Sequence, residues 1–369
     1  MAAIKRVFSG IQPTGVPQLG NYLGSIKNWV ALQKDTDGNK VTSRELFYSV
    51  VDLHALTVPR DPKRLHRETI ETAAALIACG IDPKHSVLFR QSAVPAHSQL
   101  HWALACITPV GWLNRMTQWK SKLQQQQQQE QQTDKNDKND ELSDSAINKL
   151  NVHSSAAQGL LTGLFTYPVL MAADVLLYNA THVPVGEDQV QHLEFARDLV
   201  MHFNKQYKRD IFTMPTAMLT PSKRIMSLKD PQRKMSKSDP NEQTRITLSD
   251  TDDQISRKIK KAPTDALHRI TYDPISRPGV SNLLSIYAAI RGTDPESAAL
   301  SMHAFSNAQL KEAVAEAIVS ELAPIRQEMR HLLADKGHID QVLCSNETKA
   351  RDVAHANWKT IAECIGLKA

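Results

Sequence analysis

The first quarter of the chain alternates three short β-rich segments with two helical ones, and this order restricts the possible folds strongly. The β-rich segments are Arg6–Gly10, Leu46–Asp52 and Ser86–Phe89, in which β-branched and aromatic residues favour strands. Between them, apolar residues recur at helical spacing from Gly20 onward and from about Pro62 to Cys79. A β-α-β-α-β order predicts a parallel sheet with helices on both faces. In such a sheet, ligands bind at the carboxyl ends of the strands.

Length and composition exclude several classes of protein. At 369 residues, with 41% hydrophobic and 22% charged residues, the chain is typical of a folded globular protein with one sizeable domain and a smaller one. The net charge of +5 is compatible with a polyanionic partner but is common in proteins without one. No run reaches the roughly 18 apolar residues that a membrane-spanning helix needs, so we expect no membrane association.

The four cysteines, Cys79, Cys106, Cys344 and Cys364, are scattered and show no C-x-x-C spacing. Three of them lie in apolar stretches with a helical pattern, which predicts buried, reduced thiols rather than disulfides or metal ligands. We therefore expect a reducing compartment, no structural zinc and no tightly bound metal.

The middle and the end of the chain differ from its beginning. A Gln- and Asn-rich, low-complexity segment over about residues 123–157 predicts a flexible insertion in a surface loop. Helices are predicted after it at about 167–178 and 186–203, and then at 255–261, 281–291, 309–334 and 349–365. We therefore place a domain change near residue 243, which divides the chain into an α/β domain (1–243) and an all-helical domain (244–369).

The stretch "RKMSKSDPN" at residues 233–241 holds two lysines and two serines around one methionine and contains nothing that could anchor a core. Lys234 and Lys237 are three residues apart, so both could reach one polyphosphate from a mobile loop. Taken alone, such a loop is usually an ordinary solvated turn.

A second candidate lies between the first strand and the first helix, where "SGIQPTG" at residues 9–15 is followed by "PQLGN" at 17–21. Glycines allow the backbone to approach a ligand, and the helix N-terminus offers free amides to phosphate. The segment suits a nucleotide, although an ordinary strand-to-helix loop has the same appearance.

These segments occur in order with "GNYLG", "VDLHALTV", "YPVLMAAD" and "VPVGEDQ". In this set the chain resembles the tryptophanyl-tRNA synthetases of the bacterial and organellar type, which are class I aminoacyl-tRNA synthetases. The resemblance runs from about Phe8 to the C-terminus and is interrupted mainly by the Gln-rich insertion and a few residues near 37–43. It implies a Rossmann-like, parallel-sheet nucleotide-binding domain followed by an all-helical anticodon-binding domain.

The resemblance also implies a two-step reaction. Tryptophan and ATP give tryptophanyl-adenylate and pyrophosphate, and tryptophan then passes to a ribose hydroxyl of tRNA(Trp). The attacking carboxylate is already ionised, so the protein must supply alignment and charge neutralisation rather than a general base. ATP would act with Mg²⁺.

The resemblance assigns a catalytic role to phosphate-binding residues in both loops and in Trp119–Lys122. The catalytic residues implied are Lys234, Lys237, Lys122, Gln18 and Asn21. Gln18 and Asn21 stand where the H-I-G-H signature of the class often has histidines, and they can donate hydrogen bonds but cannot become cationic. The ATP-binding residues implied are Gln12, Pro13, Thr14, Gly20, Asn21, Gly186, Glu187, Asp188, Lys234, Met235, Ser236, Lys237 and Ser238.

The amino acid would bind at the segment "YPVLMAAD". Tyr167, Met171 and Asp174 are spaced i, i+4 and i+7, so one helix face carries all three. A core stripe explains the tyrosine and the methionine, but the aspartate needs a partner, and the resemblance makes the indole N–H that partner. Such an acceptor would reject analogues without a donor. The other tryptophan-binding residues implied are Gln189, Phe8, Gly10, His54, Val183, Val185 and Ile225.

Two alternatives remain open from the sequence. A tyrosyl-tRNA synthetase would share the fold and the reaction, but that family carries a glutamine where this chain has the apolar Met171, which favours tryptophan. A non-catalytic relative that binds tRNA or other RNA would have no use for Lys234, Lys237 and Asp174 together.

The resemblance further implies a homodimer, and the apolar helix around residues 100–107 is a candidate part of its interface. A basic cluster at Arg257, Lys258, Lys260 and Lys261 would either meet RNA phosphates or form a solvated face. The eukaryotic cytosolic form departs from the K-M-S-K-S and G-E-D-Q segments that this chain keeps, and low-complexity insertions are typical of eukaryotic genomes. We therefore expect the mitochondrial matrix, with the cytoplasm as the alternative.

Overall fold

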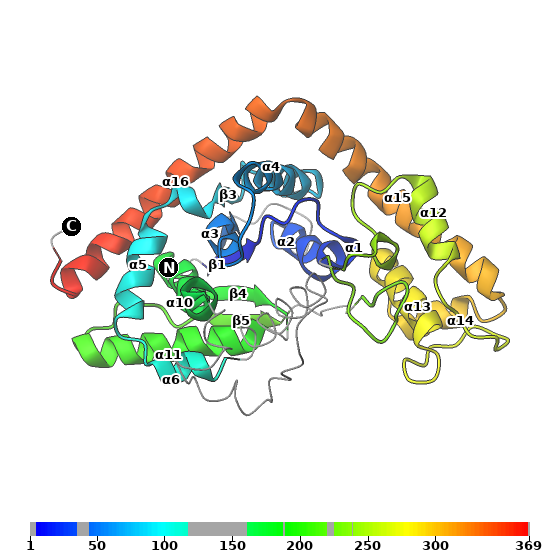
Figure 1. The fold of residues 1–369 in the computed structure, drawn as a ribbon, viewed down its shortest axis with the longest axis horizontal. Helices are drawn as coiled ribbons and strands as arrows, with labels where there is room; N and C mark the ends of the chain where they lie inside the picture. Colours follow the sequence, from blue (N-terminus) through cyan, green and yellow to red (C-terminus); the bar gives the residue numbers. More distant parts are fainter. Residues whose placement is uncertain are drawn as a thin grey trace, which may run out of the picture.

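The computed structural model describes residues 5–34, 44–116, 161–186, 189–219, 225–237 and 239–367. Within them, five strands form one parallel sheet in the order β3-β2-β1-β4-β5 (Figure 1). The strands are β1 (Lys5–Ile11), β2 (Arg44–Val50), β3 (Val87–Arg90), β4 (His182–Val185) and β5 (Thr216–Leu219). The predicted parallel sheet is confirmed, and its first three strands lie within two residues of their predicted positions. The strands β4 and β5 were not predicted.

The strand order reverses at β1, which has β2 on one side and β4 on the other. In open parallel sheets this reversal creates a crevice at the carboxyl ends of the two central strands. The residues that follow Gly10 in β1 and Val185 in β4 therefore lie at the edge of the sheet where a ligand is expected.

Alternate residues of the strands enter two different cores, one on each face of the sheet. Val7 and Leu46 belong to the first, whereas Phe8 and Phe47 belong to the second. The first core is covered by α1 (Leu19–Asn21), the π-helical turn η1 (Tyr22–Ile26), α2 (Lys27–Ala31), α4 (Pro62–Ala78), α12 (Asp252–Lys260), α13 (Pro278–Arg291), α14 (Pro295–Ser301) and α15 (Asn307–Ala334). The second core is covered by α5 (Ala96–Ala105), α6 (Val110–Asn114), α10 (Thr162–Leu177), α11 (Val190–Tyr207) and α16 (Lys336–Cys364).

Local sequence signals begin several of these helices. The carboxylate of Asp61 accepts hydrogen bonds from the backbone N–H groups of Lys63 and Arg64, and Pro62 occupies the first turn of α4. Helices α12 and α15 each begin with a reciprocal capping box, formed by Thr251 and Gln254 in α12. These caps fix the ends of the helices that the apolar spacing predicts.

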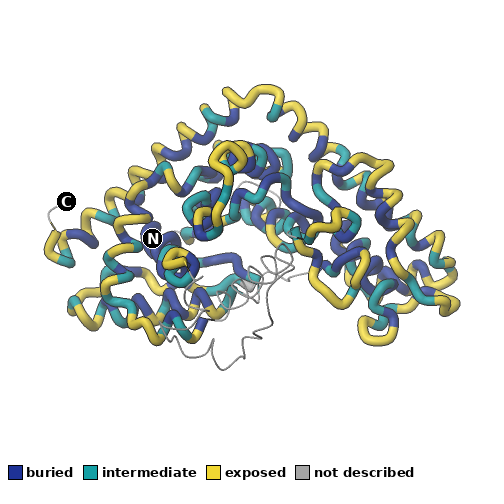
Figure 2. Tube along the Cα trace, viewed as in Figure 1, coloured by how far each residue is buried: buried dark blue, intermediate teal, exposed yellow. Residues whose placement is uncertain are grey.

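Helices α15 and α16 follow one another along one edge of the molecule, from the group α12–α14 to α5 (Figure 1). The buried side of α16 packs against the sheet domain (Figure 2), where Arg90 Nε lies 2.5 Å from Glu347 Oε1. Asn357 also donates a hydrogen bond of 2.8 Å to the carbonyl of Leu177. The C-terminal helices therefore share both cores with the sheet, and the boundary near residue 243 stays a prediction.

Several other expectations have a definite outcome. Helix α16 begins at Lys336 rather than Lys349, and α14 was not predicted. The expectation of buried thiols is wrong, because Cys106 and Cys344 are exposed and Cys79 and Cys364 are partly exposed. Two of these cysteines directly follow the last residue of α4 and of α5, where the chain leaves the core. None of the helices in the described ranges is long and apolar enough to cross a bilayer. The predicted insertion at 123–157 lies outside the described residues.

Candidate active site

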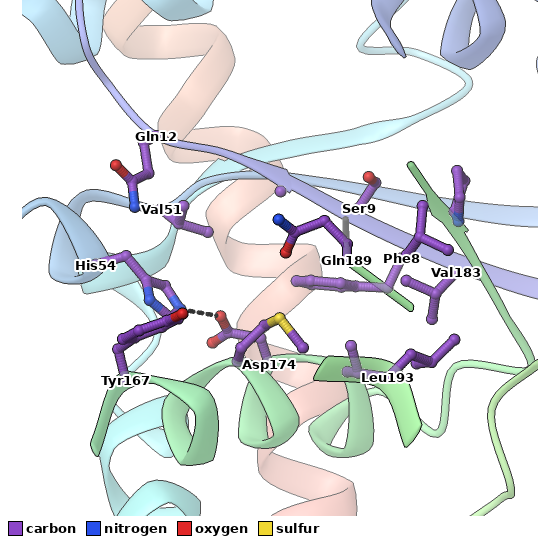
Figure 3. Close-up of a pocket in the computed structure, with 15 residues that line it drawn as sticks. Phe8, Ser9, Gln12, Val51, His54, Tyr167, Asp174, Val183, Gln189 and Leu193 are labelled. Carbon is purple, nitrogen blue, oxygen red and sulfur yellow. Dashed lines mark hydrogen bonds and ion pairs between the residues drawn. The ribbon is translucent and has the colours of Figure 1, made fainter. Parts of the chain in front are cut away.

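A cavity of about 330 Å³ opens at the carboxyl ends of β1 and β4, and we call it the Asp174 cavity (Figure 3). It lies where the strand order reverses, as the sheet topology requires. Its lining comes from β1, β4, α10, the first residues of α11 and the short helix α3 (Asp52–Ala55) with the preceding Val51. The lining residues are Phe8, Ser9, Gly10, Gln12, Val51, His54, Tyr167, Met171, Asp174, Val175, Val183, Pro184, Val185, Gln189 and Leu193.

Asp174 is the only carboxylate among these lining residues, and its side chain is surrounded by donors. His54 Nε2 lies 2.9 Å from Oδ2, and Figure 3 shows the two side chains pointing toward one another. Gln91 Nε2 and His97 Nδ1 lie 2.7 and 2.6 Å from Oδ1. Three donors from distant parts of the chain therefore contact this aspartate, and the indole N–H as a further partner stays a prediction.

These donors keep the buried acid charged. Asp174 is only 1% exposed, and burial alone would raise its pKa. The adjacent His97 and His54 outweigh that effect and lower the pKa of the carboxyl to about 2. Asp174 is therefore a hydrogen-bond acceptor without a proton of its own at neutral pH.

The helical spacing that we used for α10 is confirmed in space, because Tyr167, Met171 and Asp174 all line the Asp174 cavity. The Tyr167 hydroxyl is hydrogen-bonded to His192 Nε2 at 2.7 Å, and its ring meets that of His54 edge-on at 6.3 Å. Apart from Asp174 and a few polar groups, the lining is apolar. The cavity thus offers one charged acceptor on a wall that suits a flat apolar ring.

All but one of the ten residues predicted to bind the amino acid line this cavity. The exception is Ile225, which is buried in the first core beside Gly20. Gly10 is sterically required, because a Cβ atom there would lie 2.9 Å from Val51 Cγ1. Leu193 and Val51, whose apolar side chains carry no chemical signal, were not predicted as lining residues.

A second cavity of about 870 Å³ adjoins the first, and we call it the Lys237 cavity. The two cavities share the lining residues Gln12 and His54 and are therefore neighbours. The lining residues are Gln12, Thr14, Gly15, Val16, His54, Ala55, Thr57, Val58, Pro59, Arg60, Asp61, Arg64, Glu68, Ser236, Lys237, Arg245 and Thr247. This set brings "SGIQPTG" and "KMSKS" together, as predicted for a nucleotide site.

Lys237 is half-buried, and its Nζ has no hydrogen-bond partner among the described residues. Burial lowers the pKa of this amine to about 8, and the charges of Arg245 and Arg60 act in the same direction, against Glu68 and Glu71. An anionic ligand would stabilise a partly buried ammonium group that has no partner. We therefore expect an anionic group of the ligand to bind next to this amine.

Two arginines of this cavity share one carboxylate. Arg60 Nη1 lies 3.0 Å from Glu68 Oε2, and Arg64 Nε lies 2.9 Å from Glu68 Oε1. With Lys237 and Arg245, the cations that line the cavity outnumber the acids Glu68 and Asp61. None of the three arginines was predicted, although the basic run at residues 60–67 was a visible signal for Arg60 and Arg64.

Residues 225–227 and 233–235 pair as a short antiparallel hairpin that precedes Lys237, and backbone hydrogen bonds fix it. Ser227 N–H donates to the carbonyl of Arg233 at 2.8 Å, and Met235 N–H donates to the carbonyl of Ile225 at 3.0 Å. Met235 is 2% exposed and belongs to the first core, so the expectation that this stretch holds no core anchor is wrong. Gln18 Nε2 also donates to the carbonyl of Met235 at 2.8 Å.

The remaining predicted nucleotide residues occupy different places. Lys234 is exposed and lines neither cavity, whereas Ser236 and Lys237 line the second. Gln18 and Asn21 lie in the first turn after the loop, where Asn21 Oδ1 accepts from Gln18 N–H at 3.3 Å. The other placements are the following: Gln12 and Thr14 line the Lys237 cavity, Pro13 is buried, Gly20 lies beside Ile225, Gly186 follows β4, and Lys122, Glu187, Asp188 and Ser238 lie outside the described residues.

Comparison with known proteins agrees with this geometry. Residues 3–323 match the family described as tRNA synthetases class I (W and Y). The chain belongs to the class I tRNA synthetases of this W and Y family. The match extends from β1 into α15, so both cavities lie inside the part shared with these synthetases.

Individual class I synthetases are similar over nearly the whole chain. A mitochondrial tryptophan–tRNA ligase of Schizosaccharomyces pombe is 46% identical over 336 residues, which are 89% of this chain and 88% of that protein. The crystal structure of tryptophanyl-tRNA synthetase from Mycoplasma pneumoniae has a TM-score of 0.80 and 31% identity, and the match covers 99% of this chain and 98% of that one. The Campylobacter jejuni enzyme, complexed with ADP and tryptophan, has a TM-score of 0.73 and 29% identity over 98% of this chain and 100% of that one.

Proposed function

We propose that the protein is a tryptophan–tRNA ligase, which activates tryptophan with ATP and transfers it to tRNA(Trp). The observation that carries this proposal is the pair of adjoining cavities that share Gln12 and His54. One has an apolar wall with a single charged acceptor, Asp174, and the other has a partly buried amine among arginines. An aromatic amino acid and a triphosphate in these cavities would meet near the shared residues.

The first chemical step needs alignment more than proton transfer. An oxygen of the tryptophan carboxylate forms a bond to the α-phosphorus of ATP, and the bond to the pyrophosphate oxygen breaks. Negative charge grows on the leaving pyrophosphate, so cations that face it stabilise the transition state. Lys237 would supply that charge from the hairpin, with Arg60 and Arg245 facing the same cavity. Lys234, which is exposed in this structure, would join after a movement of the loop.

ATP would act with Mg²⁺, which polarises the phosphates. The described residues contain no group of three or more His, Cys, Asp or Glu side chains placed to hold a metal ion. Mg²⁺ keeps most of its water and commonly binds through substrate phosphates, so we expect it to enter with ATP.

Tryptophan is favoured over tyrosine by the wall of the Asp174 cavity. Met171 lies on this wall one helical turn before Asp174 and offers no hydrogen bond to a phenol. The indole N–H would donate to Asp174, and an analogue without that donor would leave one lone pair of the carboxylate without a donor.

The remaining parts of the proposal concern partners and location. A homodimer is supported by the exposed apolar side chains of Trp102 on α5, which is 70% exposed, and Val110 on α6, which is 63% exposed. A mitochondrial matrix location is supported by the similarity to the mitochondrial enzyme of S. pombe, although bacterial enzymes are similar too. Microscopy of the tagged full-length gene product distinguishes mitochondria from cytoplasm.

Pyrophosphate exchange with tryptophan and with tyrosine, measured in parallel, tests the amino-acid assignment. The wild type should prefer tryptophan. Asp174→Asn should lower kcat/KM for tryptophan roughly 10- to 100-fold, because a hydrogen bond to a charged acceptor is worth about 1.5–3 kcal/mol. Asp253→Asn, at an exposed position in the first turn of α12, is the matched control and should leave the exchange unchanged.

Two results would contradict the proposal in different ways. Equal use of tyrosine by the wild type would show that the Asp174 cavity is wrongly assigned. No exchange with tryptophan and ATP, combined with intact binding of tRNA, would favour a non-catalytic RNA-binding relative.

A further inference from the structure

Tyr178, His97 and Asp174 form a chain of hydrogen bonds between buried side chains. Asp174 lines the cavity, and the other two residues do not. The Tyr178 hydroxyl lies 3.0 Å from His97 Nε2, and His97 Nδ1 lies 2.6 Å from Asp174 Oδ1. His97 and Tyr178 are both fully buried, and neither is among the residues that line the Asp174 cavity. His97 therefore contacts the carboxylate from outside the lining of the cavity, and Tyr178 contacts only His97.

The directions of these hydrogen bonds follow from Asp174. An ionised carboxylate only accepts, so the proton of the short contact lies on His97 Nδ1. When the ring carries no second proton, Nε2 accepts from the Tyr178 hydroxyl, which lies 3.0 Å away. Tyr178 keeps that proton, because burial first and then the charge of Asp174 raise its pKa well above the ordinary value. The contact with Tyr178 thus selects the tautomer that donates to Asp174.

Aromatic packing holds the ring of His97 in place. Phe89 stacks on His97 with 6.0 Å between ring centroids, and Phe47 and Phe89 lie 4.8 and 5.7 Å from Tyr178. Phe8, which lines the Asp174 cavity, stacks on the same tyrosine at 5.4 Å. The orientation of His97 is therefore set by packing as well as by hydrogen bonds.

The donors around Asp174 leave one acceptor position open. A carboxylate has about four lone-pair sites, two on each oxygen. Among the described residues, Gln91 and His97 occupy both sites on Oδ1, and His54 occupies one on Oδ2. A ring N–H that enters the cavity is left with the second site of Oδ2.

We propose that His97, in the tautomer set by Tyr178, is a positioning residue that fixes the rotation of the Asp174 carboxylate and thereby sets the preference for a ring N–H. The proposal rests on the proposed function, because it requires Asp174 to accept from the amino acid. Without His97, Gln91 is the one donor left on Oδ1 among the described residues, and the carboxylate can turn so that Oδ2 is less firmly held toward the cavity. His97 would then act on specificity without touching the substrate.

The test compares tryptophan with 3-(benzothiophen-3-yl)alanine, in which a ring sulfur replaces the N–H. The quantity measured is the ratio of kcat/KM for tryptophan to kcat/KM for the analogue in pyrophosphate exchange. His97→Phe should lower this ratio at least tenfold, because kcat/KM for tryptophan falls. The kcat/KM for the analogue should change less than threefold. His97→Asn should restore most of the ratio, because its amide N–H can take the place of Nδ1–H. Tyr178→Phe should give an intermediate ratio.

Tyr48→Phe is the matched control for Tyr178→Phe. Tyr48 is a fully buried tyrosine of the first core, and its hydroxyl donates to the carbonyl of Trp29 at 2.9 Å. Loss of this hydroxyl should lower the free energy of unfolding without changing the ratio of the two kcat/KM values.

An equal fall of both kcat/KM values in His97→Phe, or an unchanged ratio, would overturn the proposal and leave His97 with a structural role. If His97→Phe does not fold, Tyr178→Phe decides in the same way. Failure of the proposed function looks different, because the wild type would then not activate tryptophan at all. If the wild type uses tryptophan and the benzothiophene analogue equally well, Asp174 does not select the ring N–H, and this inference fails as well.

Discussion

The partly buried amine of Lys237 makes pH a direct probe of the Lys237 cavity. Burial lowers its pKa from the ordinary 10.5 to about 8 in the unliganded protein. Only the protonated amine attracts phosphate, so the affinity for ATP should fall as the pH rises through 8. The same change leaves an arginine charged, because a guanidinium does not lose its proton in this range.

The size of the effect follows from the pKa. A group with a pKa of about 8 is about 90% protonated at pH 7 and about 10% protonated at pH 9. If ATP binds the protonated form, its Kd should rise about tenfold between these two pH values. In the absence of the amino acid no adenylate forms, so calorimetry can measure binding alone. Near pH 8, about half a proton should be taken up for each ATP bound.

Lys237→Arg keeps the positive charge but removes its titration between pH 7 and pH 9, so it shows whether Lys237 causes the pH dependence. Its Kd for ATP should be nearly flat from pH 7 to pH 9, with no proton uptake at pH 8. The reasoning about Lys237 fails if the wild type is equally flat. It fails equally if Lys237→Arg keeps the wild-type pH dependence, because the titrating group would then lie elsewhere.

Two further predictions concern the hairpin and the dimer. Asn282 on α13 is bound through both side-chain amide atoms to the backbone of Met226, at 2.9 and 3.0 Å, so Asn282→Ala should free the hairpin. The loss of two hydrogen bonds, about 2 kcal/mol, should lower kcat for pyrophosphate exchange about 30-fold. The control Ser285→Ala removes a hydroxyl that is bonded within α13 and should leave kcat unchanged. Equal rates for the two variants would contradict this prediction. Trp102→Glu should convert the proposed homodimer to a monomer in sedimentation velocity, because it places a charge on an apolar face, and a dimer that persists would exclude this face as the interface.

The parts of the fold that could be predicted from sequence are those in which one element carries its own pattern. The strands β1 to β3 alternate between two cores, and α4 combines a capping aspartate, a proline and a regular apolar face. The strands β4 and β5 have four residues each, too few for a period to appear. The first turns of α16 carry many polar residues, although the Asp335 side chain that accepts from His338 N–H was a usable signal.

The candidate site divides in the same way. Tyr167, Met171 and Asp174 share a helix, so their spacing alone brings them together. The partners of Asp174 are far away in the sequence, 83 residues for Gln91 and 77 for His97. No periodicity within one element can report contacts of that kind, because only the tertiary fold brings the residue after β3 and a residue of α5 to α10. The sequence therefore identified the acid and His54, but not Gln91 and His97, which also hold it.

The position of Lys237 depends on two contacts that reach its hairpin from different parts of the chain. Gln18, in the first turn after β1, donates to the carbonyl of Met235, and Asn282, in the C-terminal helices, holds Met226 in the opposite strand of the hairpin. The resemblance predicts that Gln18 occupies a signature position of the class, and in this structure its Nε2 donates to the hairpin backbone. A side chain that holds the hairpin should affect the same kinetic step as Lys237. Loss of Gln18 and loss of Asn282 are therefore expected to resemble each other more closely than either resembles loss of Asp174.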